Sequence, residues 1–253
     1  MRDRGRPGSG LSVLRRFDAA VPSPHRALDT PARRAALLLA YAAVALTLIE
    51  YVFSPAFFRT RFPDLAAELN GLYPHLWWAA GTILLYLPIP MLWIRFCFKQ
   101  RLRDYGWTLA IARKHWWIYG AMLLIMAPVV VIAANQPSFL AVYPFFRGAA
   151  SAPLIAIVVW ELAYLTQFLA LEFFFRGVLA IGLGQSMGRL AVWVAALPYC
   201  MIHYHKPLPE ALSAIVAGII LGELAQRTRS IAGGVLAHSS VAFTMDMLAL
   251  GRR

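Results

Sequence analysis

The sequence predicts an all-α fold: a polytopic transmembrane helix bundle of about seven to eight spans. Apolar residues make up 60% of the 253 residues and charged residues only 14%, a balance that is unusual for a soluble domain. A membrane-spanning helix needs roughly 20 apolar residues. Runs of this kind occur at residues 35–53, 76–96, 116–134, 152–183, 190–202, 211–225 and 231–250. The fourth run is long enough to be broken in two, which accounts for an eighth span.

Positive charge gathers beside the predicted spans. The net charge is +12, and residues 1–34 contain eight arginines. A second basic cluster separates the second and third runs and consists of Arg95, Lys99, Arg101, Arg103, Arg113 and Lys114. Loops rich in Lys and Arg beside membrane segments normally lie in the cytoplasm. We therefore expect a cytoplasmic N-terminus, anionic lipid headgroups as partners of both basic segments, and no nucleic acid partner.

Three segments are expected along the chain. Residues 1–34 show little apolar periodicity and no apolar core of a signal peptide, which indicates a basic, disordered cytoplasmic arm. Residues 35–150 would form the N-terminal membrane spans and the basic loop. Residues 151–250 would form the helix bundle that carries the functional site. The two cysteines, Cys97 and Cys200, lack Cys-x-x-Cys spacing, so a disulfide framework is not expected.

Ionisable side chains concentrate in the last hundred residues. Those in or beside apolar helices after residue 150 are Glu161, Glu172, Glu210, Glu223, Asp246, His203, His205 and His238. A charge in lipid costs several kcal/mol, so such residues usually face the protein interior and carry function. Glu172 and Arg176 are four residues apart in the order that favours pairing on one helical face. The C-terminal helices are therefore the predicted site.

Helical spacing adds two expectations. His238, Ala242 and Asp246 repeat every four residues and share one face, so Asp246 is a candidate to orient His238 through a water or a small shift. Small residues at Ala214, Gly218 and Gly222 form a stripe, which predicts close packing of that helix against a neighbour.

Three short motifs in this region occur in the order of a known family. Residues 172–177 read Glu-Phe-Phe-Phe-Arg-Gly, residues 199–203 read Tyr-Cys-Met-Ile-His, and residues 238–242 read His-Ser-Ser-Val-Ala. They resemble the motifs Glu-Glu-x-x-x-Arg, aromatic-x-x-x-His and His-x-x-x-Asn of the CPBP family (CAAX protease and bacteriocin-processing, or Abi-type, glutamic intramembrane endopeptidases). The resemblance covers about residues 150–250.

The resemblance implies hydrolysis of a peptide bond in a membrane protein or a lipid-anchored peptide. Glu172 would act as general base on water, His203 would position that water, and His238 would stabilise the oxyanion. Supporting roles fall to Arg176, Tyr199, Glu161 and Asp246. The expected location is a bacterial inner membrane.

Two departures from the family pattern bear on activity. The chain has Leu171 where the family has its first Glu, the usual candidate for activating water. It also has Ala242 where an amide is usual, which removes a possible oxyanion donor. Adjacent helical residues point about 100° apart, so Glu172 does not automatically take over the role of the first Glu.

Alternatives follow from the same residues. One is a catalytically inactive relative that acts as a membrane scaffold or immunity-like partner, and Leu171 favours it. A proton-coupled transporter is less favoured, because the acids crowd into one half of the chain and no paired broken-helix repeat is evident.

No cofactor is expected. Zinc held by Glu172, His203 and His238 is disfavoured, since the His-Glu-x-x-His signature is absent.

Overall fold

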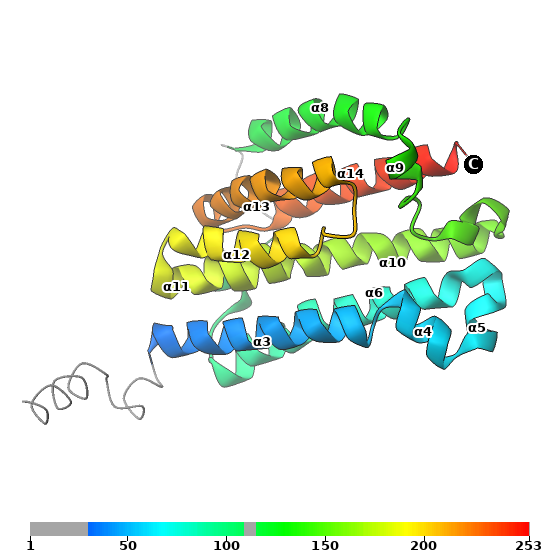
Figure 1. The fold of residues 1–253 in the computed structure, drawn as a ribbon. Coiled ribbons are helices and arrows are strands. Elements are labelled where there is room, and N and C mark those ends of the chain that lie inside the picture. The colour runs from blue at the N-terminus through cyan, green and yellow to red at the C-terminus, as the bar shows by residue number, and fades with distance from the viewer. Residues whose placement is uncertain (1–29, 109–114, 253) are drawn as a thin grey trace, which may run out of the picture.

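The computed structural model describes residues 30–108 and 115–252 and is all-α over these ranges (Figure 1). Within these ranges six helical segments are long and apolar enough to span a membrane, which makes this a multi-pass membrane protein. They centre on α3 (Pro31–Tyr51), α6 (Leu72–Tyr86), α8 (Trp116–Ala133), α10 (Leu154–Glu172), α13 (Leu208–Thr228) and α14 (Ala232–Leu250). A shorter apolar helix, α12 (Leu190–Met201), corresponds to a seventh predicted span.

Short helical segments connect these helices. Between α3 and α8 they are α4 (Pro55–Arg61), α5 (Pro63–Ala67), η1 (Glu68–Gly71), α7 (Pro88–Leu92), η2 (Trp93–Cys97) and η3 (Leu102–Tyr105). Between α8 and α12 they are α9 (Pro137–Leu140), η4 (Arg147–Ser151), η5 (Phe173–Gly182) and α11 (Leu183–Met187).

Two boundaries differ from the sequence prediction. Helix α3 begins at Pro31, so Arg33 and Arg34 lie in its first turn and not in the predicted arm; Pro suits a first helical position because its missing N–H needs no partner there. The fourth run is not broken in two, since helix continues over Leu154–Met187. The rest of the predicted arm, residues 1–29, lies outside the described residues, as do Arg113 and Lys114 of the basic loop.

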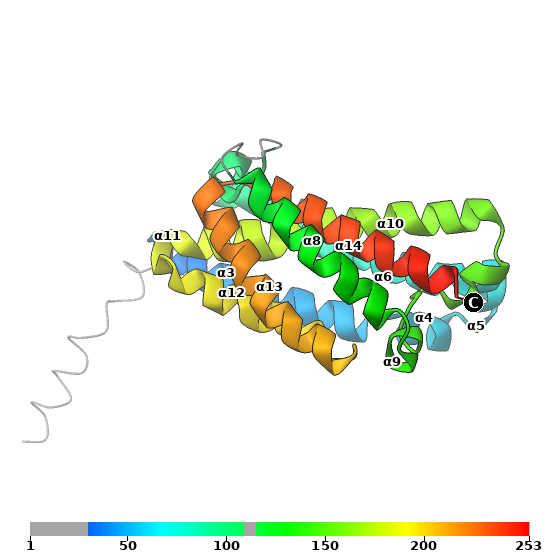
Figure 2. The same ribbon diagram turned by 90° about the horizontal axis from the view of Figure 1, so that it is seen from above.

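The helices run side by side in a bundle. Figure 1 shows α8 on one side and α3 with α6 on the other, with α10, α12, α13 and α14 between them. Helix α14 packs against both α8 and α10, and α12 packs against α13 and η5. From above, α8 and α13 cross α10 obliquely (Figure 2). The candidate site lies beside two cavities lined by these helices.

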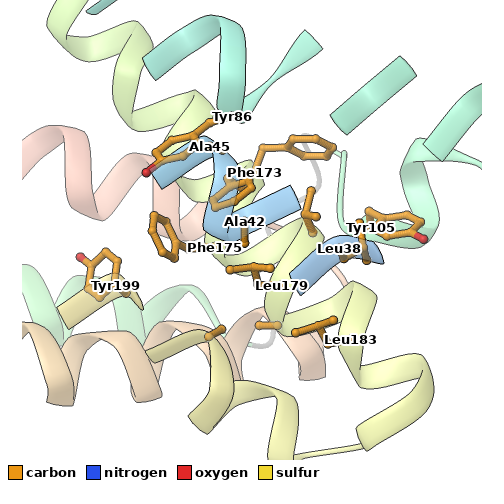
Figure 3. Packing of buried hydrophobic residues seen from close by; sticks show 14 of the residues in the cluster. Leu38, Ala42, Ala45, Tyr86, Tyr105, Phe173, Phe175, Leu179, Leu183 and Tyr199 are labelled. Atoms are coloured by element: carbon orange, nitrogen blue, oxygen red, sulfur yellow. The ribbon is translucent and has the colours of Figure 1, made fainter. Parts of the chain in front are cut away.

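Segment η5 forms the centre of the main core. Helix α10 passes at Glu172 into η5, a π-helical stretch in which all ten residues are buried. Figure 3 shows Phe173, Phe175 and Leu179 of η5 together with Leu38 and Ala42 of α3. Insertions of π-helix within α-helices are frequently found at functional sites, and here the insertion directly follows the acidic residue of the first motif.

The predicted small-residue stripe is confirmed as a packing surface. A Cβ atom added at Gly222 would lie 2.8 Å from Val192 Cγ1, and one added at Gly218 would lie 3.0 Å from Tyr199 Cδ1. The glycines thus let α13 approach α12 closely. This contact also supports Tyr199, which belongs to the second motif.

Candidate active site

Two cavities meet at the histidines of the second and third motifs. The α8-side cavity has a volume of about 150 Å³ and is bounded mainly by α8, α13 and α14. The α6-side cavity has a volume of about 190 Å³ and is bounded mainly by α3, α6 and α10. The linings of both include Tyr164, Phe168, His203, Lys206 and His238. The shared lining places the two histidines where the cavities adjoin.

His238 is held by a carboxylate from another helix. Its Nδ1 lies 3.0 Å from Oε1 of Glu172, and the histidine side chain keeps 16% of its surface exposed. A carboxylate accepts the hydrogen bond, so Nδ1 carries the proton and Nε2 is the second ring nitrogen that remains for other partners. The pair joins α14 to the end of α10.

Glu172 itself is enclosed behind His238. Its exposed fraction is 0%, and Oε2 lies 3.4 Å from Nε of Arg176. The Arg176 guanidinium carbon in turn lies 4.0 Å from the centre of the Tyr199 ring. Glu172 belongs to the lining of neither cavity. The three predicted catalytic residues therefore come together, but only the two histidines face the cavities; the carboxylate contacts His238 and Arg176 instead.

Leu171 occupies the place that the family's first Glu would have. It lines the α6-side cavity together with His203 and His238. Its neighbour Glu172 points away from that cavity, as the rotation of about 100° between adjacent helical residues predicts. An apolar side chain thus stands beside the histidines where a carboxylate is usual.

His203 is fixed by its own helix. Its Nδ1 donates to the backbone oxygen of Tyr199 at 2.8 Å, and the side chain is buried. Burial, with a contribution from Lys206, lowers the pKa of His203 far below the usual value for histidine. The ring is therefore neutral at pH 7, and Nε2 is left as a hydrogen-bond acceptor.

Asp246 and Glu161 lie apart from the histidines. Asp246 is fully buried, and its Oδ2 accepts a hydrogen bond of 3.0 Å from Nε1 of Trp160. Neither acid lines the two cavities. The carboxylate that binds His238 is Glu172, so the structure does not give Asp246 the orienting position that its spacing suggested. Position along one helix could not reveal a partner on another.

A second polar cluster lines the α8-side cavity. The Tyr143 hydroxyl donates to Oε1 of Glu210 at 2.7 Å, and Nζ of Lys206 lies 2.8 Å from the same oxygen. Glu210 does lie in the first turn of α13, as expected for a residue that favours the helix dipole. Its link to Tyr143, 67 residues away, had no signal in the sequence.

Gly234 and Gln167 are further site residues that sequence reasoning missed. A Cβ atom at Gly234 would overlap Oε2 of Glu172, and Gln167 lines the α6-side cavity. The Gly233–Gly234 pair just before the third motif was the available signal for a close approach.

Over residues 30–108 and 115–252, no three His, Cys, Asp or Glu side chains gather closely enough to hold a metal ion.

Comparison with protein families agrees with the motifs. Residues 151–244 match the family described as type II CAAX prenyl endopeptidase Rce1-like. The matched family is the CPBP family that the motifs resemble. The matched segment contains all three motifs and extends from the start of α10 to the middle of α14. Comparisons with curated proteins and with solved structures found no match.

Proposed function

We propose that the protein is an intramembrane endopeptidase that hydrolyses a peptide bond in a membrane protein or lipid-anchored peptide. The observation that carries the proposal is the hydrogen bond between Glu172 and Nδ1 of His238, at 3.0 Å, behind a cavity formed by membrane-spanning helices. A carboxylate that holds a histidine is a recurring arrangement in hydrolases, because it fixes the imidazole tautomer and stabilises the imidazolium. The match of residues 151–244 to an endopeptidase family supports the same reaction class.

In the proposed mechanism His238 is the acid–base group. Its Nε2 removes a proton from water as the water oxygen attacks the peptide carbonyl, and then returns that proton to the leaving amine. The products are a carboxylate and a free amine. Glu172 stabilises the protonated ring, Arg176 holds Glu172 in place, and Nε2 of His203 accepts a hydrogen bond from the attacking water.

A direct role of Glu172 on water is the other assignment. The carboxylate would have to turn away from His238 and Arg176, because it lines neither cavity in this structure. Breaking a buried ion pair costs roughly 3–5 kcal/mol. The geometry therefore favours His238 as the base and Glu172 as the residue that positions it.

The experiment that tests the proposal compares the termini of membrane proteins by mass spectrometry. Host cells carry the wild type, His238→Ala, Glu172→Ala or no copy. New termini seen only with the wild type are expected, and they would identify the substrate. Identical termini in all four strains would contradict the proposal.

One observation favours the inactive scaffold as a second candidate. Leu171 places an apolar side chain in the α6-side cavity beside both histidines. A scaffold predicts that a phenotype of the deletion strain is rescued equally by the wild type and by His238→Ala. An endopeptidase predicts rescue by the wild type alone.

For location we propose a bacterial inner membrane with a cytoplasmic N-terminus. The charge distribution supports this orientation, since both basic segments flank predicted spans. Anionic lipid headgroups are the proposed partners of these segments.

A further inference from the structure

Two buried polar side chains in the α6-side cavity each have an oxygen that bonds to no described residue. They are Thr82 of α6, which is 5% exposed, and Gln167 of α10, which is 4% exposed. Among the described residues nothing bonds to Oγ1 of Thr82 or to Oε1 of Gln167. Leaving a buried polar group unpaired costs about 1–3 kcal/mol, so such groups normally bind water or a ligand.

Both side chains share their cavity with the catalytic histidines. Gln167 precedes Leu171 by four residues and therefore lies on the same face of α10. Leu171, His203 and His238 line this cavity as well. A volume of about 190 Å³ leaves room for several water molecules.

Polar groups also mark the surface end of this cavity. Glu50 lines it, and the Glu50 side chain is 64% exposed. Nε2 of His205, on a side chain that is 90% exposed, lies 3.7 Å from Oε1 of Glu50. Lys206 is part of the same lining. Ionisable and polar groups thus run from the surface to the histidines.

We propose that the α6-side cavity supplies the hydrolytic water and that Gln167 and Thr82 hold it. Gln167 Oε1 accepts a hydrogen bond from a second water, which donates to the oxygen of the hydrolytic water; the two hydrogens of the hydrolytic water itself point to Nε2 of His238 and Nε2 of His203. The Thr82 hydroxyl donates to water farther along the cavity. This arrangement replaces the water-holding carboxylate that Leu171 removes. The part that concerns catalysis rests on the proposed function, whereas hydration of the cavity does not.

Hydration is tested by cysteine accessibility in the full-length protein. Thr82→Cys and Gln167→Cys are made in a Cys97→Ser, Cys200→Ala background and treated in membranes with a small charged methanethiosulfonate. The control is Leu162→Cys. Leu162 lies on the membrane-spanning helix α10 with 63% of its surface exposed, so it faces lipid, which a charged reagent does not enter. We expect both cavity cysteines to react and the control to remain unmodified. Cavity cysteines no more reactive than the control would overturn the proposal.

The catalytic part is tested by kinetics on the substrate found by mass spectrometry. Gln167→Leu should lower kcat by about 10²-fold, the order expected when a reactant is misplaced by 1 Å, with KM changed less than twofold. Leu162→Ala should leave both constants unchanged. A raised KM with normal kcat would show that Gln167 binds the peptide and not the water. If the wild type cleaves nothing, the proposed function fails, while cysteine accessibility still decides whether the cavity is hydrated.

Discussion

At the scale of single residues, the site depends on which atom of a side chain faces the cavity. His238 uses Nδ1 to bind Glu172 and retains Nε2, while His203 uses Nδ1 to bind the Tyr199 carbonyl and likewise retains Nε2. Two imidazoles are thus fixed in the same tautomer by different acceptors. In the proposed mechanism both Nε2 atoms act on one water molecule.

The role of His238 predicts how activity depends on pH. Protonation of the base abolishes its function, so wild-type kcat should fall as the pH drops through the pKa of the base. Glu172→Gln should lower kcat by roughly 10²- to 10⁴-fold, the usual contribution of acid–base catalysis. The fall of kcat at low pH, which is the acidic limb of the pH profile, should remain in this variant because His238 still titrates. His238→Gln should remove the limb. Loss of the limb in Glu172→Gln and its retention in His238→Gln would show that Glu172 is the base.

Gly234 is predicted to be essential for the Glu172–His238 pair. Gly234→Ala puts a methyl group where Oε2 of Glu172 lies, so the carboxylate must move and activity should fall at least tenfold. The matched control is Gly120→Ala, because a Cβ atom there meets nothing within 4 Å. Cleavage rates and thermal unfolding of both variants check this prediction. Full activity of Gly234→Ala would show that the position of Glu172 is not critical.

At the scale of elements, helix packing determines where the second motif lies. Helix α12 carries Tyr199 and leads into His203, and it is held against α13 by the close approach at Gly218 and Gly222. The guanidinium of Arg176 also packs over the Tyr199 ring in a cation–π contact. The seam between α12 and α13 therefore sets the distance between the second motif and the first.

Widening this seam should destabilise the protein. Gly222→Val introduces atoms into the contact with Val192, and overpacking of this kind costs about 1–3 kcal/mol. We expect a lower melting temperature in detergent and reduced activity. Gly120→Val serves as the control, since the space beside Gly120 is open. Equal melting temperatures of the two variants would contradict the close packing.

At the scale of the whole molecule, an odd number of crossings follows from where the helices begin and end. Figure 1 shows the start of α3 and the helix α11 at one end of the bundle and the C-terminus at the other. Six long helical segments with α12 as a seventh crossing give this arrangement. We therefore predict that the end of α14 lies on the opposite side of the membrane from the start of α3.

Labelling in sealed membrane vesicles checks this topology. Single cysteines at Ser186, in α11, and at Gly251, after α14, are placed in the background without native cysteines; both positions are exposed. With the proposed cytoplasmic N-terminus, an impermeant maleimide should label Ser186→Cys and spare Gly251→Cys in inverted inner-membrane vesicles, because only the cytoplasmic side is accessible there. Labelling of both positions would mean an even number of crossings.

Most of the fold was predictable because membrane spans are a local property. The length of an apolar run decides whether a helix can cross the bilayer, and the helices α3, α8, α12, α13 and α14 lie close to their predicted ranges. The end of the fourth run was harder to predict, since its continuation as the π-helical segment η5 depends on packing against α3 and α12.

The sequence by itself determined the fold class, the region of the site and the residues that meet there. Motif order and intramembrane charge were sufficient to predict that one site contains Glu172, Arg176, His203 and His238. Only the tertiary structure decided that Glu172 faces His238 and that Asp246 binds Trp160, 86 residues away. The reason is geometric: the direction in which a helical side chain points is known relative to its own helix, but the group that it meets depends on how neighbouring helices are rotated and crossed.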